Sequence, residues 1–157
     1  MTYVVGVRRF GVAAIICDSD LSIPGDARRD PAIKHGILGN GLIYGMSGGW
    51  NAAVAFIQDA KARCTAETAA ENFQILQERV RLYPYRPGEN NQFDVLISSR
   101  HSAAPQFFWI NSRTEDMQPD GGTAIGTLGS GTVLLNRIAH RFGWTHVRAL
   151  DAEDQSR

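Results

Sequence analysis

The sequence predicts an α+β fold in which two antiparallel sheets pack face to face and helices cover their outer faces. Strand-like segments occur in hairpin pairs, which indicates antiparallel pairing. Two amphipathic helical segments lie between the earlier and the later strands, where they can cover one sheet face. The segment VAAIIC at residues 12–17 is apolar throughout, so both faces of this strand are expected to be buried. Together these features predict a helix–sheet–sheet–helix sandwich.

Length and charge limit the organisation and the partners of the chain. Its 157 residues fit a single domain, 1–157, with a polar tail from about residue 150. Hydrophobic residues make up 43% of the chain, close to the globular average, so a packed core is expected. Sixteen basic residues balance sixteen acidic ones. Binding of nucleic acid or of an anionic membrane usually needs a basic surplus, so neither partner is expected.

The sequence offers no motif for a metal, a cofactor or membrane insertion. It has no HExxH or CxxC spacing, and GTLGSG at residues 126–131 lacks the glycine spacing of a nucleotide-binding loop. Cys17 and Cys64 are expected to be buried free thiols in a reducing compartment. No apolar run approaches the roughly 20 residues of a membrane span, and no signal peptide is recognisable. A cytoplasmic protein without metal or cofactor is therefore expected.

The first part of the chain reads as two hairpins. Residues 3–7 and 12–18 form the first, around a tight turn at residues 8–11. A polar loop is expected over residues 19–30. The second hairpin joins residues 33–38 to residues 42–46 through Asn40-Gly41, a pair that predicts a type I′ turn because both residues tolerate positive φ.

Two helices are expected next. The first follows Gly49 and ends near Cys64, and the second begins with a capping box formed by Thr68 and Glu71. Two prolines shortly after residue 83 end the second helix. The apolar face of the first helix comprises Trp50, Ala53, Val54, Ile57 and Ala60, and that of the second comprises Phe73, Leu76, Val80 and Tyr83.

The remainder of the chain returns to strands. They are expected at residues 93–99, 106–112 and 123–127. A third helix is expected after Gly131, with an apolar face made of Leu134, Leu135, Ile138 and Phe142.

The order of these elements and several short motifs resemble the proteasome-type β-subunits, which include the bacterial HslV peptidase and belong to the N-terminal nucleophile (Ntn) hydrolases. The motifs are the start TYVVGVRR, an aspartate ending the second strand, a lysine opening a later strand, YGMSGG before a long helix and LGSG before the third helix. The resemblance covers about the first 140 residues. It implies the four-layer αββα Ntn-hydrolase sandwich. Counted from Thr2, the family's catalytic positions fall without a gap on Asp18, Lys34, Gly48 and Ser130.

The chemistry of these residues supports the same interpretation. A threonine hydroxyl is a weak nucleophile, but removal of Met1 would free the α-amino group of Thr2, whose ordinary pKa of about 7.7–8.0 suits a general base. Lys34 would lower the pKa values of the Thr2 hydroxyl and amine. Asp18 would keep a buried Lys34 charged.

Two glycines and a serine complete the expected site. Gly48 would open the first helix and offer a backbone N–H to an oxyanion, and Gly49 would let the substrate approach closely. Ser130 would hydrogen-bond the amino group or a water that carries its proton. If the resemblance extends to the specificity pocket, Ala32, Met46 and Trp50 would form an apolar pocket for the side chain before the cleaved bond.

Each of these residues also has an ordinary structural interpretation. Thr2 can be a surface residue at a chain end, Asp18 a turn residue and Lys34 a solvated strand end. The glycine pair can be a plain helix entry and Ser130 a helix N-cap. Only their joint order and spacing favour a catalytic site.

The resemblance implies a threonine peptidase subunit of a homo-oligomeric ring that cleaves polypeptides, with an ATP-dependent unfoldase as a possible partner. Family members usually continue through a further helix and two strands, which contribute another aspartate and serine behind the site. The short segment after residue 142 predicts that these elements are missing. Two alternatives stay open: a catalytically inactive ring or scaffold subunit of the same fold, and an Ntn hydrolase that acts on a small amide.

Overall fold

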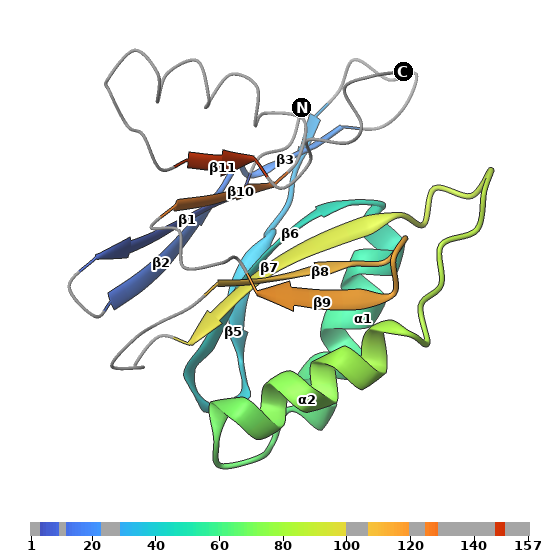
Figure 1. The fold of residues 1–157 in the computed structure, drawn as a ribbon. Helices are drawn as coiled ribbons and strands as arrows, with labels where there is room; N and C mark the ends of the chain where they lie inside the picture. The colour runs from blue at the N-terminus through green and yellow to red at the C-terminus, as the bar shows by residue number, and fades with distance from the viewer. Residues whose placement is uncertain are drawn as a thin grey trace.

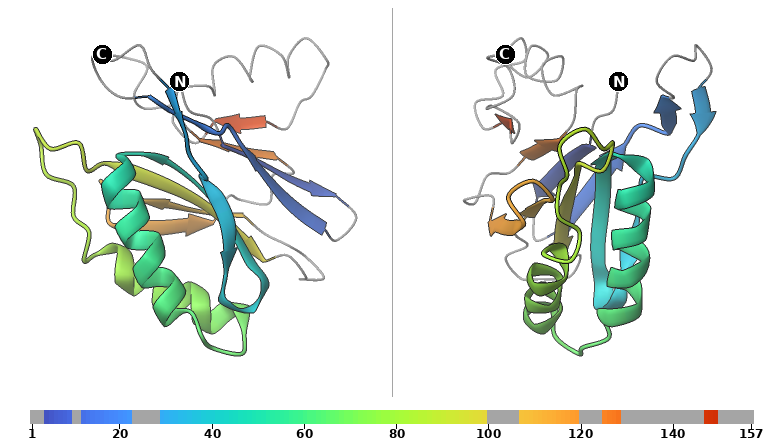
Figure 2. Two further views of the ribbon diagram at one scale, coloured as in Figure 1. Left: turned by 180° about the vertical axis from the view of Figure 1, so that it is seen from behind. Right: turned by 90° about the vertical axis from the view of Figure 1, so that its right-hand side faces the viewer.

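Two β-sheets lie face to face, and both described helices lie on the outer side of the larger sheet (Figure 1, Figure 2). The computed structural model of the chain describes residues 4–9, 12–22, 29–99, 107–119, 125–128 and 147–149. The larger sheet contains, in spatial order, β5 (His35–Leu38), β6 (Leu42–Gly48), β7 (Phe93–Ser99), β8 (Phe107–Asn111) and β9 (Asp116–Pro119). All neighbouring strands of this sheet are antiparallel.

The smaller sheet contains the N-terminal hairpin. Its spatial order is β11 (Val147–Ala149), β10 (Ile125–Leu128), β1 (Val4–Arg9) and β2 (Val12–Cys17). A third, two-stranded sheet pairs β3 (Asp20–Ser22) with β4 (Arg29–Pro31). The α+β class and the predicted antiparallel hairpins are thus confirmed. The helix expected after Gly131, which would form the fourth layer, lies outside the described residues.

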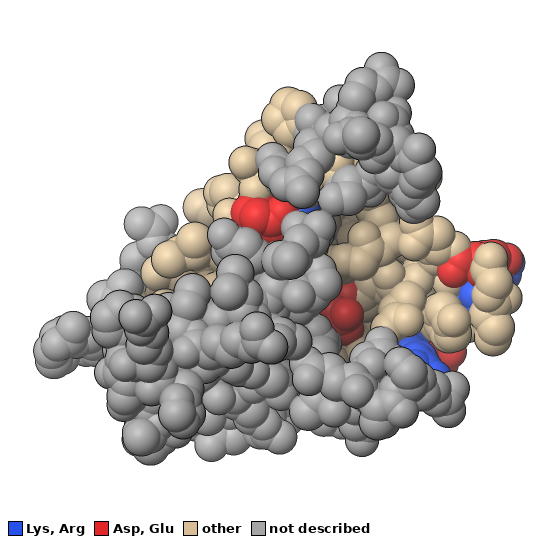
Figure 3. All heavy atoms as spheres, turned by 90° about the horizontal axis from the view of Figure 1, so that it is seen from above, with Lys and Arg blue, Asp and Glu red and all other residues tan. Residues whose placement is uncertain are grey.

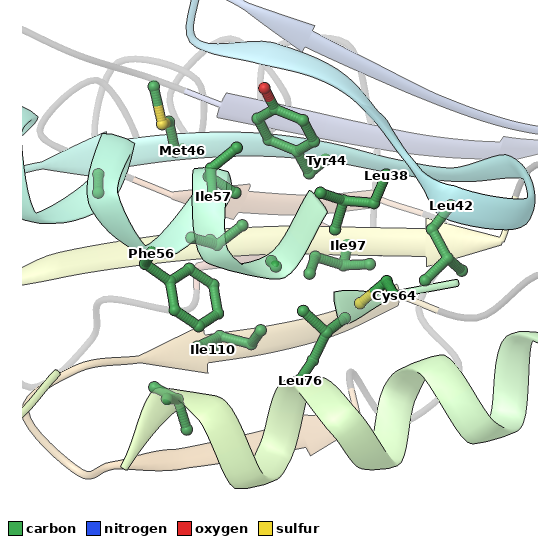
Figure 4. Packing of buried hydrophobic residues seen from close by; sticks show 14 of the residues in the cluster. Leu38, Leu42, Tyr44, Met46, Phe56, Ile57, Cys64, Leu76, Ile97 and Ile110 are labelled. Atoms are coloured by element: carbon green, nitrogen blue, oxygen red, sulfur yellow. The ribbon is translucent and has the colours of Figure 1, made fainter. Parts of the chain in front are cut away.

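The helices α1 (Trp50–Arg63) and α2 (Ala69–Val80) bury their apolar faces against the larger sheet (Figure 4). On β6, Leu42, Tyr44 and Met46 point to the helix side because they alternate along the strand. They meet Phe56 and Ile57 of α1, and further members of this cluster include Leu38, Leu76, Val80, Val95, Ile97 and Ile110. This cluster is the main hydrophobic core.

Local hydrogen bonds define how the helix pair begins and turns. The predicted capping box is present, since the Thr68 side chain accepts from the Glu71 N–H and the Glu71 carboxylate accepts from the Thr68 N–H. The fully buried Asn72 accepts the Ala66 N–H at 3.1 Å and donates to the Ala66 carbonyl at 3.0 Å. One side chain therefore fixes the connection between α1 and α2.

An ion pair joins α1 to α2, and an aromatic contact joins α1 to the segment that follows α2. Arg79 of α2 donates twice to the Asp59 carboxylate of α1, at 2.6 and 2.9 Å. Tyr83, predicted within the second helix, lies beyond its end and meets the Phe56 ring edge-on at 5.6 Å. Because Asp59 supports the charged guanidinium, the pKa of Arg79 is raised.

The larger sheet and the smaller sheet approach each other closely at two positions where glycine has no side chain. A Cβ atom at Gly6 of β1 would lie 2.7 Å from the Phe107 ring of β8. A Cβ atom at Gly45 of β6 would lie 2.8 Å from the Cys17 sulfur of β2. Real Cβ atoms do not tolerate such distances, so glycine sets the spacing of the sheets at both points.

Several elements differ from the sequence-based expectation. β3 lies within the predicted loop at residues 19–30 and β4 begins in it, and β9 and β11 were not predicted. β11 pairs with β10 in parallel, whereas only antiparallel pairing was expected. The hairpin at Asn40-Gly41 is closed by a 3₁₀ turn over residues 39–41, and only Gly41 of this pair has positive φ. The type I′ turn was therefore wrong.

The outer face of β2 is more exposed than VAAIIC suggested. Ile15 and Cys17 face the larger sheet, but Ile16 on the opposite face is 58% exposed. The prediction that both faces of this strand are buried was thus wrong for Ile16.

Charged side chains of both signs lie on the face of the molecule drawn in Figure 3. In Figure 3, the basic side chains visible on this face lie next to acidic ones. Of the helices that the structure describes, none is long and apolar enough to cross a membrane.

Replacing Asn72 with alanine is expected to lower the free energy of unfolding by about 2 kcal/mol, because the N–H and carbonyl of Ala66 lose their partner. The matched control is Gln74→Ala on the exposed side of α2, which should change stability by about 0.5 kcal/mol or less. Urea denaturation at fixed protein concentration measures both. Equal stability of the two variants would contradict this role of Asn72.

Candidate active site

A buried ion pair lies where β2 ends and β5 begins. The Lys34 ammonium is 2.7 Å from the Asp18 carboxylate, and the side chains are only 4% and 12% exposed. Asp18 directly follows β2, and Lys34 directly precedes β5. Burying an ammonium is costly, and a carboxylate at hydrogen-bond distance offsets much of that cost. The structure thus brings together the two charged residues that the sequence analysis selected.

The backbone of Lys34 is fixed as firmly as its side chain. Its carbonyl accepts the Met46 N–H of β6 at 2.8 Å and the Cys17 thiol of β2 at 3.6 Å. The thiol contact is weak, but both donors converge on one oxygen. Hydrogen bonds therefore connect Lys34 to the larger sheet through β6 and to the smaller sheet through β2.

Cys17 is held as a neutral thiol. Burial raises its pKa to about 12, and the negative charge of Asp18 acts in the same direction, while Lys34 opposes them. The thiolate is the reactive form of cysteine, so Cys17 is unsuited to nucleophilic chemistry. Burial likewise raises the pKa of Cys64 to about 11. Both cysteines are free as expected, although Cys17 is only half-buried.

The Gly48-Gly49 turn differs in detail from the prediction. Gly48 is the last residue of β6, Gly49 is the N-cap, and α1 begins at Trp50, so Gly48 does not itself open the helix. Gly48 has φ +93°, a conformation that favours glycine, and it is exposed. Gly49 is buried, and its N–H donates to the Gln92 carbonyl at 2.6 Å.

The proposed apolar pocket is only partly recognisable. Met46 is 3% exposed within the main core, and the half-buried Trp50 packs against the same cluster. Ala32 is also buried, and its N–H donates to the Ser19 carbonyl at 2.7 Å, but it does not belong to that cluster. In this conformation Met46 is chiefly a core residue and exposes little surface to a ligand.

Two predicted residues, Thr2 and Ser130, lie outside the described part of the chain. His35, beside Lys34, is exposed while Lys34 is buried. Among the described residues, no group of three or more His, Cys, Asp or Glu side chains could hold a metal ion.

Sequence reasoning missed two features near the turn. Asp94 on β7 is a buried carboxylate, 8% exposed, and pairs across the sheet with Ser47. A single acidic residue inside the apolar run FDVLI was a signal that could have identified it. The Gln92 carbonyl that binds Gly49 had no such signal, because a backbone contact leaves no trace in residue type.

Structure comparison shows that the chain has the fold of HslV and the proteasome β-subunits. It is similar to the crystal structure of eukaryotic HslV from Trypanosoma brucei, with a TM-score of 0.65 and 13% identity over 88% of this chain and 78% of that one. It is also similar to Anbu, described as an ancestral β-subunit, from Yersinia bercovieri, with a TM-score of 0.72 and 17% identity over 95% of this chain and 69% of that one.

Sequence comparison gives no corresponding match. No protein-family model matches the chain, and no curated protein matches it. At the identities found, the structural similarity establishes the fold alone.

Replacing Asp18 with alanine is expected to lower the free energy of unfolding by about 3 kcal/mol, because the buried Lys34 ammonium loses a carboxylate at hydrogen-bond distance. Adding Lys34→Met should restore about half of this loss or more, since an apolar side chain of similar size needs no counter-ion. A double-mutant cycle in urea measures the coupling. Strictly additive effects of the two substitutions would contradict a coupled pair.

Cys17 in the folded protein is expected to react with iodoacetamide at about pH 8.5 at least about 100-fold more slowly than after unfolding, because a pKa of about 12 leaves very little thiolate. Peptide mass spectrometry distinguishes Cys17 from Cys64. The folded-state rate should keep rising as the pH approaches about 12. A rate that levels off near pH 9 would contradict the raised pKa.

Proposed function

We propose that this chain, which has the fold of HslV and the proteasome β-subunits, is a threonine peptidase subunit that cleaves peptide bonds with Thr2 after removal of Met1. The observation that carries the proposal is the buried pair of Lys34 and Asp18, at the end of the strand that pairs with β1. Burial of an ammonium group costs desolvation free energy. Such groups are often found at functional sites, where the charge can activate a nearby nucleophile.

Chain length limits how far the proposed groups can lie from one another. Val4, the first residue of β1, pairs with Cys17, which directly precedes Asp18. Two residues span at most about 7 Å, so Thr2 stays within that distance of Val4. A Cβ atom on Gly45 would overlap the Val4 side chain, and three further residues along β6, about 10 Å, end at the glycine turn. These short spans support a single site.

The first step is attack on the substrate. Methionine is commonly removed ahead of a small residue such as threonine, which leaves the Thr2 amine free. The amine takes the hydroxyl proton, directly or through a water, as the Thr2 oxygen bonds to the carbonyl carbon of the scissile peptide. The Lys34 ammonium favours the developing alkoxide by its charge.

The second step releases the products. The negative charge that forms on the substrate oxygen is stabilised by the Gly48 N–H, near the positive end of α1. Breakdown of this intermediate passes the proton to the leaving amine and leaves an ester on Thr2. A water, deprotonated by the Thr2 amine, then hydrolyses the ester and restores the hydroxyl.

The remaining predicted residues support binding. Ser130 hydrogen-bonds the amine or its water, Gly49 permits close approach of the substrate, and Ala32, Met46 and Trp50 contribute an apolar pocket that favours apolar side chains. Access to Met46 requires a local shift, since it is buried.

The resemblance to proteasome-type subunits extends the proposal to assembly. A homo-oligomeric ring encloses the site, so that confinement selects unfolded polypeptide, and an ATP-dependent unfoldase supplies it. A cytoplasmic location and a single domain over residues 1–157 belong to the same proposal.

Replacing Thr2 with alanine is expected to lower peptide hydrolysis by at least about 1000-fold while leaving the assembly intact, because the nucleophile is lost. The matched control Thr65→Ala, at an exposed position, should retain full activity. In the unmodified protein, intact mass spectrometry should find the chain without Met1. Addition of a peptide epoxyketone or β-lactone should increase that mass by one inhibitor, and Thr2→Ala should not be labelled.

Other outcomes select the alternatives. Retained Met1 without an adduct indicates a non-catalytic subunit of the same fold. Labelling of Thr2 with hydrolysis of small amides but not of peptides indicates an amidase. A stable monomer in light scattering contradicts enclosed proteolysis.

A further inference from the structure

We infer that Asn91 is a positioning residue that holds the Gly48-Gly49 turn in its reactive geometry, an inference that rests on the proposed function of Gly48. The hydrogen bonds of the Asn91 side chain go to Pro84, Arg86 and Glu89 of its own loop. Asn91 acts through the loop at residues 84–92, which leads from the segment after α2 to β7.

The Asn91 side chain closes this loop. Its oxygen accepts the Arg86 N–H at 3.1 Å, and its nitrogen donates to the Pro84 carbonyl at 3.2 Å. The same nitrogen is 3.4 Å from the Glu89 carboxylate. The loop contains no helix or strand, so these contacts replace the backbone pairing that would otherwise order it.

The residue after Asn91 carries the contact to the turn. The Gln92 carbonyl accepts the Gly49 N–H at 2.6 Å. On its other side, the Phe93 N–H donates to the buried Ser112 hydroxyl at 2.8 Å, and the Ser112 N–H donates to the Phe93 carbonyl at 3.0 Å. Gln92 is therefore held between a core anchor at Ser112 and a loop anchor at Asn91.

The backbone of the loop also lies directly against the Gly48-Gly49 turn. A Cβ atom at Gly48 would overlap the Gln92 carbonyl oxygen, and one at Gly49 would overlap the Asn90 carbonyl oxygen. With so little space between the two segments, movement of the loop changes the position of the turn. Gly48 ends β6, where it pairs with Phe93 of β7, and its left-handed φ then takes the chain out of regular strand geometry.

Loss of the Asn91 side chain is expected to weaken binding of the transition state and to leave binding of the substrate unchanged. An oxyanion donor acts on charge that develops during the reaction, so a misplaced Gly48 N–H lowers kcat and leaves KM nearly unchanged. The pair of Lys34 and Asp18 is held by β2 and β6, so the pH dependence of the reaction should not move.

The test compares Asn91→Ala with Asn51→Ala, an exposed asparagine on α1, in the assembled full chain without Met1. With a fluorogenic peptide, Asn91→Ala should lower kcat about tenfold, with KM within about twofold and an unchanged pH profile. Inhibition by a peptide aldehyde, which forms a tetrahedral adduct, should weaken about tenfold, while the matching peptide alcohol binds as before. Asn51→Ala should change none of these values.

Hydrogen exchange separates this inference from the proposed function. In Asn91→Ala, the Gly49 amide should exchange at least about tenfold faster, whether or not the protein is active. Unchanged exchange, or equal weakening of aldehyde and alcohol binding, overturns the inference. An inactive unmodified protein refutes the proposed function, and with it the effect on kcat, while faster exchange would still establish that Asn91 braces the turn.

Discussion

The hydrogen-bonded ion pair between Lys34 and Asp18 is the contact on which the arrangement of the candidate site depends. Its two residues lie just beyond regular strands, Asp18 after β2 and Lys34 before β5. The ammonium joins the end of β2, and the Lys34 carbonyl joins β6 through the Met46 N–H. One residue thereby fixes the distance between the N-terminal hairpin and the larger sheet at the edge where the nucleophile is proposed to lie.

Glycine makes that short distance possible. Side chains at Gly6 or Gly45 would push the sheets apart, and side chains at Gly48 or Gly49 would push the loop before β7 off the turn. At Gly6 and Gly45 the missing side chain leaves room for side chains of the facing sheet, and at Gly48 and Gly49 it lets backbone groups come close enough to position one another. The Gly49 N–H is held by the Gln92 carbonyl, whereas Lys34 is held by Asp18 through its side chain and by the Met46 N–H through its carbonyl.

The sequence predicted the features that periodicity and capping encode. The amphipathic face of α1, the box at Thr68 and Glu71, and the hairpin pairing all follow from local patterns. Asp18 and Lys34, which form the ion pair, were selected through the resemblance to proteasome-type β-subunits. Strands of three or four residues, such as β3, β9 and β11, are too short to show a period. Contacts made by backbone atoms, such as that from Gly49 to Gln92, carry no residue signature, and the burial of Ile16 could not be judged without knowing what covers β2.

The fold is shared with solved structures of only 13% and 17% identity, which agrees with the tolerance of a hydrophobic core to substitution. The main hydrophobic cluster lies between the larger sheet and its helices, and it tolerates exchange among apolar residues of similar volume. The charged pair and the glycine turn of the candidate site lie at strand ends, while Met46 and Trp50 of its expected pocket belong to or pack against the cluster. Exchange of apolar residues in the core can therefore alter much of the sequence without changing the architecture. A shared fold does not by itself carry the reaction, because loss of a single charged or nucleophilic residue would end catalysis and leave the architecture unchanged.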